Sequence, residues 1–356
     1  QTEDFVDPTD MFIPEYAYFS SISSCFLEHA KNYVNQMTAR FSLHQKSLVA
    51  EVAANDGYLL QYVRDKGIPC YGIEPTQSAA NIAVSRGIEI IGDFFGKKLA
   101  NTLANNGKKV DLAVANNVLA HVPDINDFVN GFTQILKPKG VATFENPHLL
   151  KMIEEKQFDT VYHEHFSYLS LTAVNTIFKR NGLMIFDVEE LPVHGGSLRY
   201  YAQRLETGTY PISKNVGQIF QKERNAGLKK FDFYQSFQNQ AQIIKNEFLG
   251  FLRDQKKKGK LVAGYGAAAK GNTLLNFCGV KEDSVNFIVD KNPNKQGMYS
   301  PGSKIPIVEE KVIFEKKPDI IVIFPWNIKE EIEKQLTYVR EWGCKFAVAI
   351  PRLNVF

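Results

Sequence analysis

The sequence predicts an α/β protein, with a doubly wound, mainly parallel sheet followed by a second, smaller α/β domain. From Ser47 onward, apolar strand-like runs alternate with helical runs across short loops. That alternation is typical of parallel sheets with crossover helices. It breaks after residue 150 and resumes near residue 256. A chain of 356 residues is also long enough for two domains.

The elements follow in order along the chain. Apolar residues at helical spacing, from Phe26 to Met37, predict a first helix, and the serines of "SSISS" before it are candidate N-caps. Strands of the first sheet are predicted within 47–54, 69–75, 88–95, 110–122 and 141–147, with helices at 57–67, 78–87 and 125–140. A helix at 170–182 precedes two strands within 183–205, which suit an antiparallel hairpin at a sheet edge. After the connector "ETGTYPISKNVG", one long amphipathic helix is predicted to run to about Asp254.

The composition limits the class of partner. The net charge of +3 is too small to indicate nucleic acid or a membrane as the main partner. Four separated cysteines form no CxxC pair, so neither a disulfide framework nor a zinc site of this chain is expected. Reduced thiols and a polar first segment without a secretory leader predict a cytoplasmic protein. The oligomeric state stays open, with a monomer as the simplest form.

The loop after the first strand, in "EVAANDGYLL", favours a cationic nucleotide without phosphate. A pyrophosphate loop needs several glycines and exposed N–H groups. This loop has a single glycine, Gly57, and carries Glu51, Asn55 and Asp56. S-adenosylmethionine has a sulfonium and an ammonium but no phosphate, so it suits such a loop. Ala53 and Tyr58 belong to the same segment and are included in the predicted cofactor site.

Further acids and aromatic residues follow the next strands. Glu74, with Pro75 after it, ends the second strand, where an acid can accept the ribose hydroxyls. The segment "GDFF" offers Asp93 for the adenine amine and Phe94 or Phe95 for stacking. The fourth strand places Asn116 and His121 near the carboxyl edge of the sheet. Each acid alone would equally suit a cap or a surface turn, but three acids at successive strand ends favour a ligand site.

Seven segments, in order, resemble the sugar C-methyltransferase family. They are "EYAYFSS" (15–21), "EVAANDGYLLQY" (51–62), "GIEPT" (72–76), "YHEHFSYLSL" (162–171), "HGGSLR" (194–199), "AAAKGNTLLN" (267–276) and "VDKNPNKQGMYSPGSKIPI" (289–307). The resemblance implies S-adenosylmethionine-dependent methylation at C-3 of a nucleotide-linked 4-keto-deoxyhexose. It also implies a class I methyltransferase sheet over 44–210, preceded by a lead-in and substrate-site lid over 1–43. A Rossmann-like domain that binds the sugar nucleotide is expected over 211–356.

Members of this family usually begin with a cysteine-rich zinc-binding domain. This chain lacks those cysteines and starts where that domain would end. Zinc is therefore expected only if such a domain precedes residue 1.

Methylation of carbon needs a base near an acidic C–H bond and donors for the enolate oxygen. The segment "YHEH" supplies suitable groups, and a neutral histidine is a good base near pH 7. The family resemblance assigns His165 as the base. It places Tyr162, Glu164, Tyr16 and His121 around the sugar.

The histidines of these segments also have alternative interpretations. A metal site in "HEH" is less well supported, because the familiar helical zinc pattern spaces its histidines four apart, and no metal is expected. In an alternating segment the His163 side chain is expected to point away from that of His165, which favours a structural role for His163. His194 in "HGGSLR" suits either close ligand approach or a tight hairpin.

The glycine-rich segment "LVAGYGAAAKGNTLL" has the strand–turn–helix form of a dinucleotide loop, although it departs from the usual fingerprint. We expect its helix N-terminus to hold the diphosphate of a sugar nucleotide, with Lys270 and Asn272 as ligands and Tyr299 on a nearby loop. NAD binding stays open, because Asp290 follows the next strand. A non-catalytic nucleotide-binding protein and a methyltransferase acting on oxygen or nitrogen are the alternative functions.

Overall fold

The computed structural model describes residue 2, residues 6–14 and residues 18–356. The chain forms two compact units: residues 1–150 together with 163–228, and residues 151–162 together with 229–356. The division differs from the boundary predicted after residue 210. Helix α9 (Lys214–Ala226) packs against the first unit, whereas the short helix η3 (Phe158–Thr160) packs against a helix of the second.

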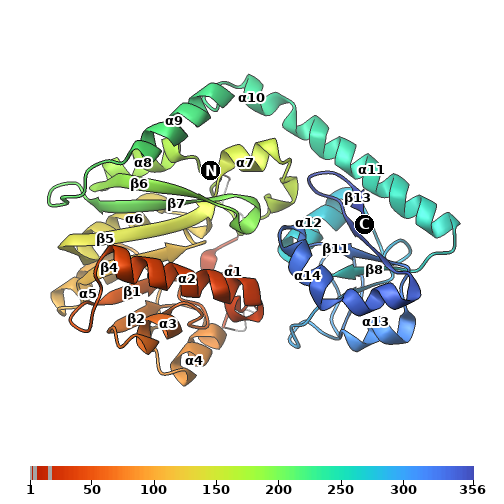
Figure 1. The fold of residues 1–356 in the computed structure, drawn as a ribbon, viewed down its shortest axis with the longest axis horizontal. Helices are drawn as coiled ribbons and strands as arrows, with labels where there is room; N and C mark the ends of the chain where they lie inside the picture. Colours follow the sequence, from red (N-terminus) through yellow and green to blue (C-terminus); the bar gives the residue numbers. More distant parts are fainter. Residues whose placement is uncertain (1, 3–5, 15–17) are drawn as a thin grey trace. The chain divides into compact units, whose positions relative to one another are not determined.

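The first unit is built on a seven-stranded sheet in the order β3-β2-β1-β4-β5-β7-β6 (Figure 1). Its strands are β1 (Val49–Val52), β2 (Cys70–Ile73), β3 (Glu89–Ile91), β4 (Val110–Asn116), β5 (Leu136–Pro147), β6 (Leu183–Leu191) and β7 (Ser197–Arg204). Strands β1 to β5 are parallel, and β7 is antiparallel to both of its neighbours. The predicted doubly wound sheet with an antiparallel hairpin at one edge is therefore confirmed.

Helices cover both faces of this sheet because its buried strands are apolar on both sides. One core cluster contains Val49 and the buried side chains of α2, and the other contains Ala50 and those of α6. The N-cap of α2 is Ser23, within the predicted "SSISS". The helices of this unit are α1 (Pro8–Met11), α2 (Ser24–Arg40), α3 (Leu60–Asp65), α4 (Gln77–Ser85), α5 (Lys97–Asn105), α6 (Ile125–Ile135), α8 (Leu171–Arg180) and α9, with short turns η1 (Ser20–Ile22), η2 (Leu119–His121) and η4 (Val193–Gly195). Helix α7 (Leu149–Glu154) begins in this unit and ends in the other.

The second unit contains a six-stranded sheet in the order β10-β9-β8-β11-β12-β13, in which only β13 is antiparallel to its partner (Figure 1). Its strands are β8 (Val262–Tyr265), β9 (Phe287–Val289), β10 (Ile307–Val308), β11 (Ile320–Ile323), β12 (Lys345–Val348) and β13 (Asn354–Val355). Its helices are α10 (Asp232–Gln235), α11 (Phe237–Lys257), α12 (Ala269–Cys278), α13 (Lys311–Lys316) and α14 (Lys329–Gln335), with η3, η5 (Trp326–Ile328) and η6 (Thr337–Trp342). The smaller Rossmann-like α/β unit is thus present.

Three elements differ from the prediction. Residues 136–140 begin β5 and do not extend α6, since Pro138 cannot continue a helix. The helix α5 was not predicted. The long helix expected up to about Asp254 is three helices, and the first ends at Gly227 in the left-handed conformation (φ 84°). Within the described residues, no helix is both long and apolar enough to cross a membrane.

Candidate active site

The loop after β1 repeats the backbone of a glycine-rich nucleotide loop with fewer glycines. Ala53, Asn55 and Gly57 all have positive φ, at 57°, 49° and 76°. A Cβ atom at Gly57 would lie 2.5 Å from Cδ1 of Ile88, so this position also requires glycine for space. The loop turns sharply at the carboxyl edge of the sheet, where folds of this kind bind ligands.

A buried carboxylate without compensation faces this edge. Glu51 is 1% exposed, and neither of its carboxylate oxygens makes a hydrogen bond with any described residue. Burial raises the pKa of Glu51 well above its usual value, and the nearby Tyr58 hydroxyl only moderates that effect. The side-chain oxygen of Asn116, on the adjacent strand β4, is likewise buried without a donor among the described residues.

These two acceptors fit the methionine end of S-adenosylmethionine. A buried acceptor without a donor is costly unless a ligand supplies one. An ammonium group would donate hydrogen bonds and neutralise the carboxylate, whereas a phosphate would be repelled. Glu51 and Asn116 are therefore suited to the predicted cationic cofactor.

Glu74 connects the loop to the second strand. One of its carboxylate oxygens accepts a hydrogen bond from the Asn55 backbone N–H at 2.9 Å, and the other accepts one from the Thr76 N–H at 2.9 Å. The second of these oxygens also accepts a hydrogen bond from the Thr76 hydroxyl, so the oxygen bound to Asn55 is the one with a further lone pair for a ribose hydroxyl. Pro75 follows directly. Burial raises the pKa of Glu74, an effect that these hydrogen bonds oppose.

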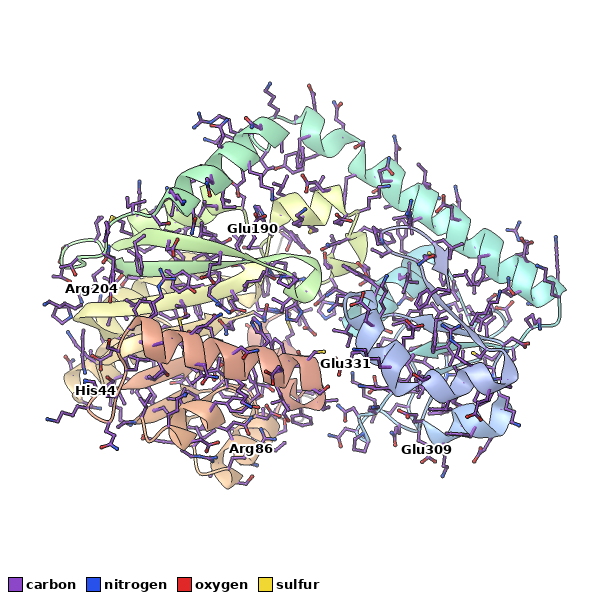
Figure 2. All side chains as sticks on the ribbon, viewed as in Figure 1. His44, Arg86, Glu190, Arg204, Glu309 and Glu331 are labelled. Atoms are coloured by element: carbon purple, nitrogen blue, oxygen red, sulfur yellow. The ribbon has the colours of Figure 1, made fainter. Side chains whose placement is uncertain are left out.

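Two polar side chains of the loop form hydrogen bonds with residues 18–21 of the lead-in segment. The Asn55 side chain accepts a hydrogen bond from the Ser20 N–H at 2.8 Å and donates one to the Tyr18 carbonyl at 3.1 Å. Asp56 accepts hydrogen bonds from Ser21 and lies 3.6 Å from Arg86, which is labelled in Figure 2. Ser21 and Arg86 thus contact one Asp56 oxygen, whereas its other oxygen is buried without a hydrogen bond among the described residues, and a role of Asp56 toward the ligand stays a prediction.

The segment after β3 divides its two aromatic residues between different roles. Phe95 packs edge-on against Phe132, with ring centroids 4.9 Å apart, and so belongs to the core. Phe94 is 41% exposed, and Asp93 is also exposed. Of the two phenylalanines, Phe94 is the one placed to stack on a base.

His165, the predicted base, lies beside His121, which follows strand β4 in the short helix η2. The rings of His121 and His165 are 4.7 Å apart between centroids and nearly perpendicular. The cause is a backbone contact: the Phe166 N–H donates a hydrogen bond to the Ala120 carbonyl at 2.8 Å. His165 is 8% exposed, whereas His163 is exposed.

Two of the remaining residues predicted to surround the sugar lie just before His165 in the chain. Glu164 is partly exposed in the same loop as His165. Tyr162 is the last residue of the segment that belongs to the second unit. Tyr16 lies outside the described residues.

His194 lies near the cofactor loop. Its backbone is left-handed (φ 54°), and its ring packs edge-on against Phe26 at 5.5 Å. Phe26 in turn stacks on Tyr58 at 4.9 Å. The two glycines after His194 therefore form a turn whose histidine faces the aromatic residues beside the loop after β1.

In the second unit, the glycine-rich turn before α12 is packed against its own domain. A Cβ atom at Gly266 would lie 2.6 Å from Pro325, and one at Gly271 would lie 2.9 Å from Phe324. The Ala267 N–H donates to Asp290 at 2.7 Å, and Lys295 lies 3.8 Å from the same carboxylate. Asp290 thus accepts a hydrogen bond from the loop after the first strand of its unit, as Glu74 does, and in addition has a lysine beside it.

Lys270 and Asn272 lie in the first turn of α12, both partly exposed. Asp159 is close enough to Lys270 for their charges to interact, and it accepts a hydrogen bond from the Trp326 indole at 2.7 Å. Burial raises the pKa of Asp159 to about 6 and lowers the pKa of Lys270. Tyr299 is 65% exposed.

The sequence interpretation missed a buried ion network under the loop. Glu145, near the end of β5, lies 2.8 Å from His29 and 2.6 Å from Arg199. Burial would raise the pKa of Glu145, but the hydrogen bond from His29 and the Arg199 charge lower it. An acid near the end of the fifth strand was the available signal. No cluster of three metal-binding side chains occurs in the part of the chain that the structure describes.

Family models match the chain in two parts. Residues 26–188 match a methyltransferase domain, and residues 192–351 match the C-methyltransferase C-terminal domain. C-methyltransferase NovU of Streptomyces niveus is 32% identical over 346 residues, which cover 97% of this chain and 82% of that protein. The ubiquinone biosynthesis O-methyltransferase of Bartonella tribocorum is 26% identical over 94 residues, 26% of this chain and 38% of that protein.

Solved structures of methyltransferases resemble part of the chain. One from Thermotoga maritima, described as a possible histamine N-methyltransferase, covers 55% of this chain and 99% of its own, with 17% identity and a TM-score of 0.40. The family assignment rests on the sequence match to NovU, which extends over both compact units. The chain therefore belongs to the C-methyltransferase family and is an S-adenosylmethionine-dependent methyltransferase.

Proposed function

We propose that the protein methylates C-3 of a nucleotide-linked 4-keto-deoxysugar, with His165 as the general base. The observation behind this proposal is the pair of histidines, His121 and His165, in the same unit as the loop with Glu51 and Glu74. A C–H bond is acidic enough for a histidine only when a carbonyl group lies beside it. A ketone at C-4 supplies that carbonyl to C-3.

In this mechanism His165 removes the C-3 proton as the enolate forms. A buried, neutral imidazole is a suitable base near neutral pH. The adjacent His121 ring, whose centroid is 4.7 Å from that of His165, would share a proton with His165 or donate to the enolate oxygen. Bound S-adenosylmethionine supplies the electrophilic methyl group, and Glu51, Asn116 and Glu74 would hold it.

The hydroxyls of Tyr162 and Tyr16 are further candidates for the enolate oxygen, and Glu164 for a sugar hydroxyl. These roles rest on the family resemblance.

The nucleotide part of the substrate is assigned to the second unit. Lys270 offers a positive charge at the start of the ten-residue helix α12, where backbone N–H groups also favour an anion. Asn272 and the exposed Tyr299 are the further candidates there. The substrate would thus be a small nucleotide sugar, with the diphosphate bound by Lys270.

The test is exchange of the C-3 proton. The enzyme would be incubated with dTDP-4-keto-6-deoxyglucose and S-adenosylhomocysteine in deuterated water. Wild-type protein should exchange that proton, and His165→Asn should slow both exchange and methyl transfer by about 10²–10⁴-fold. Affinity for S-adenosylmethionine should change less than about twofold, because His165 is not in the loop after β1.

His163→Asn is the matched control, since it removes an exposed histidine two residues away. It should retain both activities. Wild-type exchange in the His165→Asn variant would contradict the assignment of the base.

A further inference from the structure

The stretch between His148 and Leu171, called the excursion here, carries His165 and includes residues 151–162, which belong to the second unit. The chain leaves this unit after Leu150 and returns to it at His163. At the base of the excursion, the Leu149 N–H donates a hydrogen bond to the Leu169 carbonyl at 2.9 Å. The position of His165 therefore depends on how the two ends of the excursion, near His148 and Leu171, are held.

One carboxylate contacts both ends. Glu223, on α9, has one oxygen 2.8 Å from Nε2 of His148 and 2.6 Å from the Leu171 N–H. Its other oxygen accepts hydrogen bonds from the Thr172 N–H at 2.9 Å and from the Thr172 hydroxyl at 2.6 Å. Glu223 and His148 are each only 1% exposed. Both oxygens of this buried carboxylate are therefore fully used.

The contacts are more than a helix cap. Helix α8 already has an N-cap, since the Ser170 hydroxyl accepts a hydrogen bond from the Ala173 N–H at 3.1 Å. Burial would raise the pKa of Glu223, but the hydrogen bonds from His148 and Thr172 lower it. A charged carboxylate at the start of α8 is also favoured by the helix dipole. What Glu223 adds to the existing cap is the connection to His148.

His148 extends this connection to a second loop of the site. Its backbone N–H donates a hydrogen bond to the Gly196 carbonyl at 3.0 Å, in the turn that carries His194. Holding the His148 side chain therefore fixes the chain just after β5, which contacts both the excursion and the turn that carries His194.

We propose that Glu223 is a positioning residue, which fixes both ends of the excursion through His148 and the start of α8 and so sets the place of His165. This inference rests on the proposed role of His165 as base. Glu223 makes no contact with the reacting atoms, so its effect is on geometry. A displacement of about 1 Å can cost about 100-fold in rate.

The test compares Glu223→Gln with Glu190→Gln. Glu190 forms an exposed ion pair with Lys222, the neighbour of Glu223 on α9, and is labelled in Figure 2. Glu223→Gln keeps the shape of the side chain but replaces one of the two accepting oxygens with an NH₂ group, which cannot accept a hydrogen bond from His148, Leu171 or Thr172. We expect C-3 exchange and kcat to fall together by about 10–100-fold, with KM for the sugar nucleotide and the Kd of S-adenosylmethionine within about twofold. Glu190→Gln should leave all four values unchanged.

A second pair of variants keeps the inference testable if Glu223→Gln does not fold. His148→Leu removes the donor and should show the same selective loss, whereas His148→Gln retains an amide donor and should recover most of the exchange rate. Exchange within twofold of wild type in folded Glu223→Gln or His148→Leu would overturn the inference. So would a loss of S-adenosylmethionine affinity parallel to the loss of exchange. Failure of the proposed base shows separately, as exchange that survives in His165→Asn.

Discussion

Glu51 is the residue that distinguishes this cofactor loop from a phosphate-binding one. Its carboxylate is buried on β1, and none of the described residues donates a hydrogen bond to it. Asp56, the other acid of the loop, is contacted by Ser21 and Arg86. Those contacts involve one Asp56 oxygen, and its other oxygen is buried without a hydrogen bond among the described residues, as both Glu51 oxygens are, so both acids suit a cationic nucleotide.

The raised pKa of Glu51 predicts that binding of S-adenosylmethionine releases protons. A cation lowers the pKa of a nearby carboxylate, so the bound pKa lies below the raised free pKa. Affinity should therefore increase with pH between those two values and level off above the free pKa. Calorimetry in buffers of different ionisation enthalpy measures the released protons.

Glu51→Gln should abolish that buffer dependence and weaken binding by about 1–3 kcal/mol, the scale of a lost charge-assisted hydrogen bond. An unchanged buffer dependence in this variant would show that the protons come from another group.

The order of strands predicted which residues lie at the carboxyl edge of the sheet, and long-range contacts explain what the sequence could not show. Asn116 ends strand β4, Glu74 follows β2, and Glu51 is the last residue but one of β1, so all three lie toward the carboxyl edge of the sheet. By contrast, Asp56 is contacted by residues distant in the chain, and Phe95 turns into the core against α6. Neither outcome is visible in local spacing.

At the scale of elements, the turn before α12 looks like a nucleotide fingerprint but serves packing. Gly266 in this turn approaches Pro325, and Gly271, inside α12, approaches Phe324; both of these partners directly follow β11. The close contacts are therefore made by the domain's own side chains. The diphosphate, by our proposal, is left to the charge of Lys270 and the helix start.

Gly271→Ala should destabilise the protein by about 1–3 kcal/mol, because its Cβ would lie 2.9 Å from both Cβ and Cγ of Phe324. Gly250→Ala, in the interior of α11, is the matched control. No heavy atom lies within 4 Å of a Cβ at Gly250, so this change should stabilise by about 0.5–1 kcal/mol. Denaturant unfolding measures both changes, and a neutral Gly271→Ala would contradict the packing role.

The sheet elements were predictable because apolar runs alternate regularly, but helix ends depended on single residues. Pro138 ends α6 early, and Gly227 interrupts the long helix that the amphipathic pattern suggested. The short α5 has Leu99, Ala100 and Leu103 on the side that packs on the core, a helical spacing that the sequence prediction missed.

At the scale of the whole molecule, the two units repeat one strand arrangement with different charges beside it. In each, an acid after the second strand accepts a hydrogen bond from the loop after the first: Glu74 from Asn55, and Asp290 from Ala267. Lys295 neutralises Asp290, whereas Glu51 remains uncompensated among the described residues. The first unit therefore suits a cation, and the lysines of the second suit an anion.

Segments spread along the chain pointed to the family, and the match to NovU over 97% of the chain agrees with them. The transfer of residues 151–162 to the second unit was not predictable. It depends on Asp159 and Phe158, whose contacts lie more than a hundred positions away in the sequence.

The most direct test of the account is the position of the transferred methyl group. The enzyme would be incubated with S-adenosylmethionine labelled with ¹³C in the methyl group, and with dTDP-, GDP- and CDP-linked 4-keto-6-deoxyhexoses. Two-dimensional NMR of the product should show the labelled methyl bonded to C-3, with couplings to C-2 and to the C-4 carbonyl. A labelled methyl on oxygen or nitrogen, or no methylated product from any of the three substrates, would contradict the account.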